Sequence, residues 1–132
     1  MPGDYFHYQA QNRNMTVDGS LSAGGTVTVV PKNANHRLYI QKVQVAINTH
    51  ANAKTITLGD GTLTIGTIND LTAAAGVPDV VLFDFGPKGR ALTLGATFTI
   101  TSASSGPVAD VHIECYEKLD ATISHAAGAS SQ

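Results

Sequence analysis

Apolar and polar residues alternate through most of this chain, and the polar partner is most often threonine. Residues 25–30 read Gly-Thr-Val-Thr-Val-Val, and residues 97–101 read Thr-Phe-Thr-Ile-Thr. A period of two places alternate side chains on opposite faces of an extended chain, as in a half-buried β-strand. The pattern therefore predicts strands and leaves no room for long amphipathic helices.

The same pattern recurs between turn signals along the chain. We expect strands at residues 25–30, 38–47, 54–58, 62–65, 80–85, 97–101 and 111–116. The sequence Gly59-Asp60-Gly61 predicts a tight hairpin turn. Within residues 38–47 the apolar phase shifts by one position near Gln41-Lys42, which predicts a β-bulge.

These short strands predict an all-β fold, an antiparallel β-sandwich or jelly-roll-like barrel with extended N- and C-terminal arms. Periodicity does not separate a jelly-roll wiring from an immunoglobulin-like one. The expected division is an N-terminal arm at 1–23, a β-sandwich at 24–118 and a C-terminal tail at 119–132. One short helix is expected at 70–76. We expect deletion of residues 1–20 to leave a folded sandwich.

The chain carries unusually little charge. Charged residues make up 14% of its 132 residues, and the net charge is −2, whereas soluble domains average about 25% charged residues. The dispersed lysines and arginines argue against nucleic-acid binding. No apolar run is long enough for a transmembrane helix, and the N-terminus lacks signal-peptide features, so we expect no membrane partner and synthesis in a cytoplasm. A surface of threonine and serine is easily desolvated, which favours contact with other subunits.

Few residues form a pattern that suggests chemistry. Glu114 and Glu117 could act as paired carboxylates, but their spacing on one strand points them to opposite faces, and a solvated strand edge explains them better. Asp60 is interpreted as a turn residue rather than a calcium ligand. Cys115 is alone, so no disulfide forms within the chain, and it is expected to be a small buried side chain. We expect no enzyme activity, no metal and no cofactor.

The candidate site residues are therefore residues of an interface. On the last predicted strand, His112, Glu114 and Tyr116 are expected to face outward, where His112 is either a pH switch or simply exposed. Three aromatic residues stand close together near the N-terminus: Tyr5, Phe6 and Tyr8. They either fold back on their own sandwich or anchor the arm in a neighbouring subunit.

Five segments follow one another along the chain: Gly-Thr-Val-Thr-Val-Val, Arg-Leu-Tyr-Ile-Gln-Lys-Val-Gln-Val-Ala-Ile, Thr-Ile-Thr-Leu-Gly-Asp-Gly, Leu-Thr-Leu-Gly-Ala-Thr-Phe-Thr-Ile-Thr and Val-Ala-Asp-Val-His-Ile-Glu-Cys-Tyr-Glu. Their succession resembles small β-sandwich virion proteins of tailed bacteriophages. Capsid decoration, or cement, proteins are the most similar of these, over about residues 24–118. The resemblance implies a homo-oligomer, often a trimer, that binds the major capsid protein on the exterior of the expanded head. Alternatives are a tail, fibre or baseplate module that binds carbohydrate or another virion protein, and a small enzyme.

Overall fold

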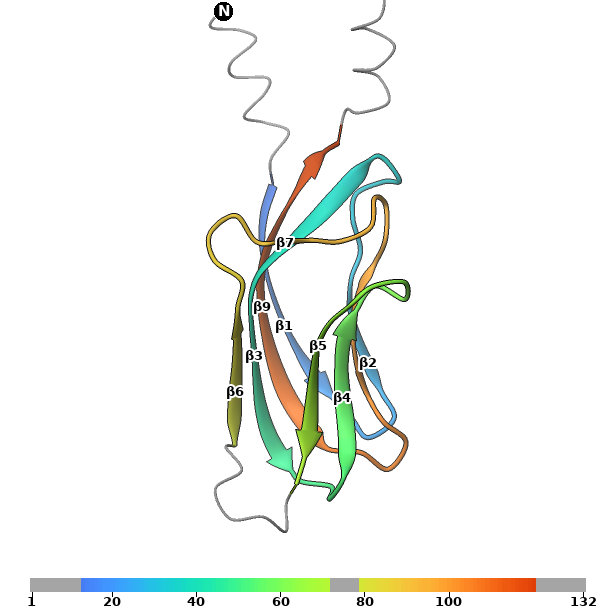
Figure 1. Cartoon of the computed structure of the whole chain (residues 1–132), viewed down its shortest axis with the longest axis vertical. Helices are drawn as coiled ribbons and strands as arrows, with labels where there is room; N and C mark the ends of the chain where they lie inside the picture. Colours follow the sequence, from blue (N-terminus) through green and yellow to red (C-terminus); the bar gives the residue numbers. More distant parts are fainter. Residues whose placement is uncertain (1–12, 72–78, 121–132) are drawn as a thin grey trace, which may run out of the picture.

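The computed structural model describes residues 13–71 and 79–120, and this part of the chain is built of antiparallel strands in two facing sheets (Figure 1). The strands are β1 (Arg13–Leu21), β2 (Thr26–Val29), β3 (His36–Thr49), β4 (Lys54–Gly59), β5 (Thr64–Asp70), β6 (Val80–Asp84), β7 (Arg90–Ala91), β8 (Phe98–Ser102) and β9 (Val108–Leu119). The predicted all-β antiparallel sandwich is confirmed.

The strand order identifies the wiring that periodicity left open. Sheet A has the order β1-β9-β3-β6, with β7 also paired to β3, and sheet B has the order β2-β8-β4-β5. The pairs β1–β9, β2–β8, β3–β6 and β4–β5 are nested, as if one long hairpin closed at the β4–β5 turn had been folded over on itself. That nesting is the jelly roll, whereas an immunoglobulin-like sandwich places consecutive strands side by side in one sheet.

The alternation in the sequence becomes the division between core and surface. In β8, Phe98 and Ile100 are fully buried while Thr99 between them faces outward. In β9, Val111, Ile113 and Cys115 are buried in the core, as predicted. Each strand thus contributes every second side chain to one apolar layer between the sheets.

Both local features predicted from the sequence are present. The register of β3 against β9 shifts between Ile40 and Lys42, so Gln41 forms the expected bulge. In the β4–β5 hairpin, Asp60 N donates to Leu63 O at 2.9 Å, and Gly61 adopts a φ of 89° that favours glycine. The second strand of this hairpin starts two residues later than predicted and extends to Asp70.

Nine residues of the expected N-terminal arm belong to the sandwich instead. Residues 13–21 form β1, which pairs with β9 from Arg13↔Glu117 to Leu21↔Ala109. Leu21 is fully buried, and Met15 and Val17 pack against the core. Deleting residues 1–20 would remove nearly all of this edge strand, so the structure leads us to expect a loss of stability where the sequence led us to expect a folded sandwich.

Other expectations concern residues outside the described ranges. These are the arm aromatics Tyr5, Phe6 and Tyr8, the tail beyond residue 120, and most of the helix expected at 70–76. Its first residue, Asp70, is the last residue of β5. Over residues 13–71 and 79–120, no helix has the length and apolar character needed to cross a membrane.

Candidate interaction surfaces

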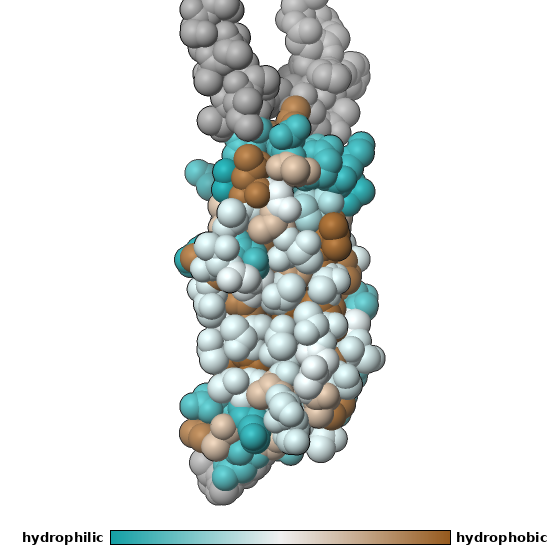
Figure 2. Space-filling view, turned by 90° about the vertical axis from the view of Figure 1, so that its right-hand side faces the viewer, coloured by the Kyte–Doolittle hydropathy of each residue, from teal (hydrophilic) through white to brown (hydrophobic). Residues whose placement is uncertain are grey.

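The outer face of sheet B is covered by threonine. One row crosses all four strands through the register pairs Thr26↔Thr101, Thr101↔Thr57 and Thr57↔Thr67. The hydroxyls of Thr26 and Thr101 lie 3.3 Å apart. The strand positions that face outward here are Thr26, Thr28, Thr55, Thr57, Thr67, Asn69, Thr99 and Thr101. None of these side chains is charged, and Figure 2 shows the face as a pale band between more hydrophilic ends.

This face explains the low charge of the whole chain and has a physical consequence. Removing a neutral hydroxyl from water costs far less than removing an ion, and a partner can satisfy its hydrogen bond. Threonine is also stiff at χ1, so little side-chain entropy is lost when it becomes part of an interface. The face is therefore suited to burial against another protein surface.

The outer face of sheet A carries the charges that sheet B lacks. His112 on β9 contacts two carboxylates, with Nδ1 2.5 Å from Asp18 Oδ1 and Nε2 3.3 Å from Glu114 Oε2. The hydrogen bond to Asp18 is the main reason why the pKa of His112 is raised from 6.5. Partial desolvation lowers this pKa, and the bond to Glu114 raises it further. His112 and Glu114 thus face outward as predicted, but they are already hydrogen-bonded to each other.

Beside this ion-pair group the same face is hollowed. The hollow has a volume of about 370 Å³ and is lined by Asp18, Gly19, Ser20, Gln44, Ala46, Asp110, Val111 and His112. Asp110 is held between Ser20 Oγ at 3.3 Å and Asn48 Nδ2 at 3.0 Å. Small side chains at the centre and fixed polar groups at the rim make this a shallow polar recess.

Tyr116 also lies on the outer face of sheet A, but its ring and its hydroxyl already contact other residues of the same chain. Its ring stacks on Tyr39 with centroids 4.8 Å apart, and its hydroxyl donates to Lys88 O at 2.7 Å. The Nζ of Lys118 lies 5.2 Å from the centroid of the Tyr39 ring. Partial burial raises the pKa of the Tyr116 hydroxyl. The pair is a structural element of the sheet, so Tyr116 offers no free ring as an anchor.

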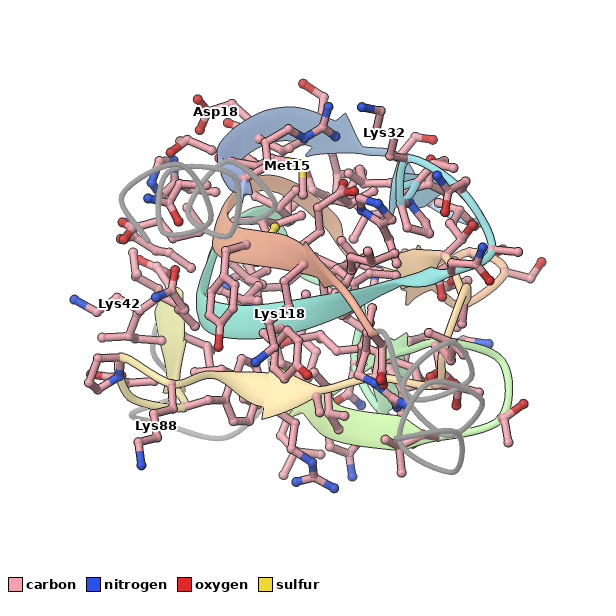
Figure 3. The ribbon with its side chains drawn as sticks, turned by 90° about the horizontal axis from the view of Figure 1, so that it is seen from above. Met15, Asp18, Lys32, Lys42, Lys88 and Lys118 are labelled. Atoms are coloured by element: carbon pink, nitrogen blue, oxygen red, sulfur yellow. The ribbon has the colours of Figure 1, made fainter. Side chains whose placement is uncertain are left out.

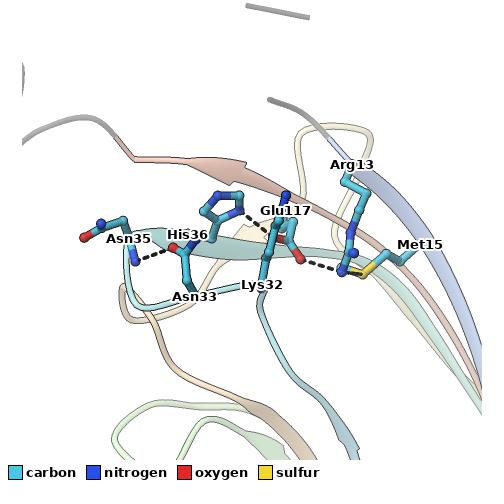
Figure 4. A network of polar contacts seen from close by, with 7 residues as sticks. All are labelled: Arg13, Met15, Lys32, Asn33, Asn35, His36 and Glu117. Carbon is cyan, nitrogen blue, oxygen red and sulfur yellow. Dashed lines mark hydrogen bonds and ion pairs between the residues drawn. The ribbon is translucent and has the colours of Figure 1, made fainter. Parts of the chain in front are cut away.

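Glu117 is the residue whose surroundings the sequence pattern predicted wrongly. It is fully buried rather than part of a solvated edge, although it does point away from the face of Glu114 as expected. Its carboxylate accepts hydrogen bonds from Arg13 Nη2 at 2.9 Å, Lys32 N at 3.1 Å and the ring of His36 at 2.5 Å (Figure 4). The signal was available, because Glu117 continues the inward series of alternate positions on β9.

The Glu117 cluster lies at the end of the sandwich where β1 begins and β9 ends (Figure 1). At the same end, Arg37 forms an ion pair with Asp120 at 2.7 Å and donates to Leu92 O at 2.8 Å. Seen from above, Lys32, Lys42 and Lys88 point away from the sandwich (Figure 3). Residues 13 and 120 are thus fixed close together by buried or half-buried charge pairs.

A second histidine cluster closes the opposite end of the sandwich. His50, after β3, lies 2.8 Å from Asp70 Oδ1 and 2.9 Å from Asp79 Oδ1. The hydrogen bond to the buried Asp70 is the largest cause of its raised pKa, followed by the bond to Asp79. The sequence gives no local signal for this contact, because its members are far apart in the chain. Over the described ranges, no group of three or more histidine, cysteine or acidic side chains could hold a metal ion.

No family model and no curated protein matches the chain. Similar solved structures include the capsid of the Helicobacter pylori bacteriophage KHP30, at TM-score 0.48 and 14% identity over 83% of this chain and 88% of that one. The capsid asymmetric unit of cyanophage Pam1 is similar at TM-score 0.42 and 17% identity, over 82% and 81%. A pilus-like Bacillus endospore appendage is similar at TM-score 0.44 and 12% identity, over 82% and 87%. At these values the likenesses carry no argument about function.

Proposed function

We propose that this chain is a non-enzymatic structural protein of a tailed-phage virion, a decoration protein that binds the major capsid protein on the outside of the expanded head. The uncharged threonine face of sheet B carries the proposal. It is a broad surface that costs little to desolvate, on a chain whose sequence resembles cement proteins. We place the contact with the capsid on this face.

The arrangement of the chain ends supports the same role. Arg13 and Asp120 are held at one end of the sandwich by the Glu117 cluster and by the pair with Arg37. Residues 1–12 and 121–132 are therefore tethered to one rigid end, from which they can reach neighbouring subunits. In this proposal Tyr5, Phe6 and Tyr8 are the anchors, and copies associate as trimers. Many modest contacts repeated over a shell raise the cost of separating its subunits through multivalency.

One observation favours a second candidate, a tail, fibre or baseplate module that binds carbohydrate. The hollow on sheet A presents the fixed carboxylate of Asp110 beside the exposed amide of Gln44. Such polar groups around a small apolar floor suit a hydroxyl-rich ligand. A glycan-array signal that is lost in a Gln44→Ala variant would favour this candidate over the first.

The deciding experiment is co-sedimentation with purified expanded capsids that lack this protein. The decoration role predicts saturable binding at a fixed ratio to capsid subunits and a shell that resists heat better. Thr57→Arg combined with Thr101→Arg should weaken binding at least about tenfold, which corresponds to about 1.4 kcal/mol. Gln44→Arg on sheet A is the matched control and should bind normally. Absence of binding, or equal loss in the control, would contradict the proposal.

A further inference from the structure

One edge of the sandwich differs from the other three. Sheet A ends at β6, whose partner among the described strands is β3. The side chains of Val80 and Leu82 face outward on β6 and are 50% and 56% exposed. The outward positions of the other edge strands are threonine, serine, asparagine or aspartate: Asn14, Thr16, Asp18 and Ser20 on β1, Thr26 and Thr28 on β2, and Thr67 and Asn69 on β5.

The backbone of β6 is also available for pairing. Asp79 O accepts from Ile47 N at 2.6 Å, and Phe85 N donates to Gln41 O at 2.8 Å. Since hydrogen-bonding direction alternates along an antiparallel strand, the N–H and C=O groups of residues 80, 82 and 84 point to the open side. Edge strands are usually protected by charged side chains, above all lysine, by proline or by a bulge. β6 has no lysine, proline or bulge, and its charged residue, Asp84, stands at its end.

We infer that the open edge of β6 binds the N-terminal segment, residues 1–12, of a second copy of this chain as an added strand. The segment has the right chemistry. Phe6, Tyr8 and Ala10 stand at alternate positions, and aromatic residues favour strands. Backbone hydrogen bonds would give affinity, and the alternate aromatic side chains would pack on Val80 and Leu82.

Charge disfavours a second β6 as the occupant. Antiparallel pairing of two β6 strands about Leu82 would place Asp84 opposite Val80 of the other copy and one position from Asp79, so each end of the contact would carry two carboxylates. Like charges close together across strands are destabilising. Residues 5–12 contain no acidic side chain, so the N-terminal segment avoids this repulsion.

Distance rules out this pairing for residues 5–9 of the same chain. An added strand beyond β6 would lie four strand spacings from β1, about 19 Å. It would also begin about 10 Å further along the sheet, because Arg13 is level with Leu38 whereas Asp84 is level with Lys42. With residues 5–9 placed along β6, four links would have to join residue 9 to Arg13, and they span at most about 14 Å.

The first test is the solution mass of the full chain by light scattering over a concentration series. We expect concentration-dependent association that Leu82→Lys weakens at least about tenfold, since the lysine would bring a charge into the pairing edge. Thr28→Lys, at an exposed position on the β2 edge, is the matched control and should associate normally. A monomer at every concentration, or association unaffected by Leu82→Lys, would overturn the inference.

The second test identifies the segment. Under mild oxidation, a Tyr8→Cys chain mixed with a Leu82→Cys chain should give a disulfide-linked heterodimer, whereas Tyr8→Cys mixed with Thr28→Cys should not. The native Cys115 does not interfere, because it is buried and its pKa is raised to about 11. Equal cross-linking to both partners, or a cross-link within one chain of the double variant, would overturn the inference. The inference rests on the self-association named in the proposed function and specifies its contact, and the two fail separately, since a chain that does not bind capsids would still associate with itself.

Discussion

The two outer faces of this sandwich are built by the same alternating pattern and differ in what occupies the outward positions. On sheet A these positions carry Asp18, His112 and Glu114, in which His112 is hydrogen-bonded to both carboxylates. On sheet B they carry rows of threonine with no ion among them. The comparison teaches that a low overall charge can arise because one face has no charged residues, rather than because charged residues are sparse over the whole surface. Only such a face is inexpensive to bury against a partner.

The largest expected effect comes from removing an edge of sheet A. Deleting residues 1–20 takes away nearly all of β1, and with it the partner of β9. We expect this variant to lose most of the stability of a domain of this size, about 5–15 kcal/mol. Deleting residues 1–12 leaves β1 intact and, at concentrations where the chain is monomeric, should not shift the urea midpoint measured by circular dichroism. Equal midpoints for the two deletions would show that β1 is dispensable.

A second comparison sets the inner and outer carboxylates of β9 against each other. Glu117→Ala should cost about 3 kcal/mol, because it leaves Arg13, His36 and the Lys32 amide without their shared buried acceptor. Glu114→Ala removes an exposed carboxylate and should cost about 0.5 kcal/mol or less. Urea denaturation measures both. Similar losses of stability in the two variants would mean that burial does not make Glu117 more important to the fold than Glu114.

The carboxylate of Asp60, in the β4–β5 turn of sheet B, leads to a prediction about stability at acidic pH. Burial opposes its charge, but the amides of Thr93, Leu63 and Thr62 outweigh burial and lower its pKa to about 2. A lowered pKa stabilises the fold above the unfolded value near 3.8, and this stabilisation is lost as the pH falls through about 2. Asp60→Asn should flatten the acid limb of a stability–pH curve. An unchanged limb would assign acid sensitivity to other carboxylates.

The smallest expected effect concerns the histidines. His112, facing Asp18 and Glu114, and His50, facing Asp70 and Asp79, both have raised pKa values. A raised pKa means that their stabilisation is complete below pH 6.5 and is lost as the pH rises through the raised value. The urea midpoint should therefore fall slightly between pH 6 and pH 9, and less in a His112→Gln, His50→Gln variant. A midpoint that rises with pH would reverse the sign of this prediction.

The sequence by itself determined the features that depend on neighbouring residues. Alternation located the main strands of the sandwich from residue 26 onward, the Asp60-Gly61 turn located the hairpin, and a phase shift located the bulge at Gln41. It also indicated the outward direction of His112, Glu114 and Tyr116. These features follow from backbone geometry within a few residues, which is why a pattern can reveal them.

Only the tertiary structure decided how distant segments meet. Strand order turned separate threonine-rich strands into one uncharged face and chose the jelly roll. It also made residues 13–21 a strand, whose alternation is weakened by Gly19, through pairing with β9 nearly a hundred residues away. The same pairing gave Glu117 its partner Arg13 across 104 positions. Such contacts depend on which strands become neighbours, and the period of a strand says which way a side chain points but not what it meets.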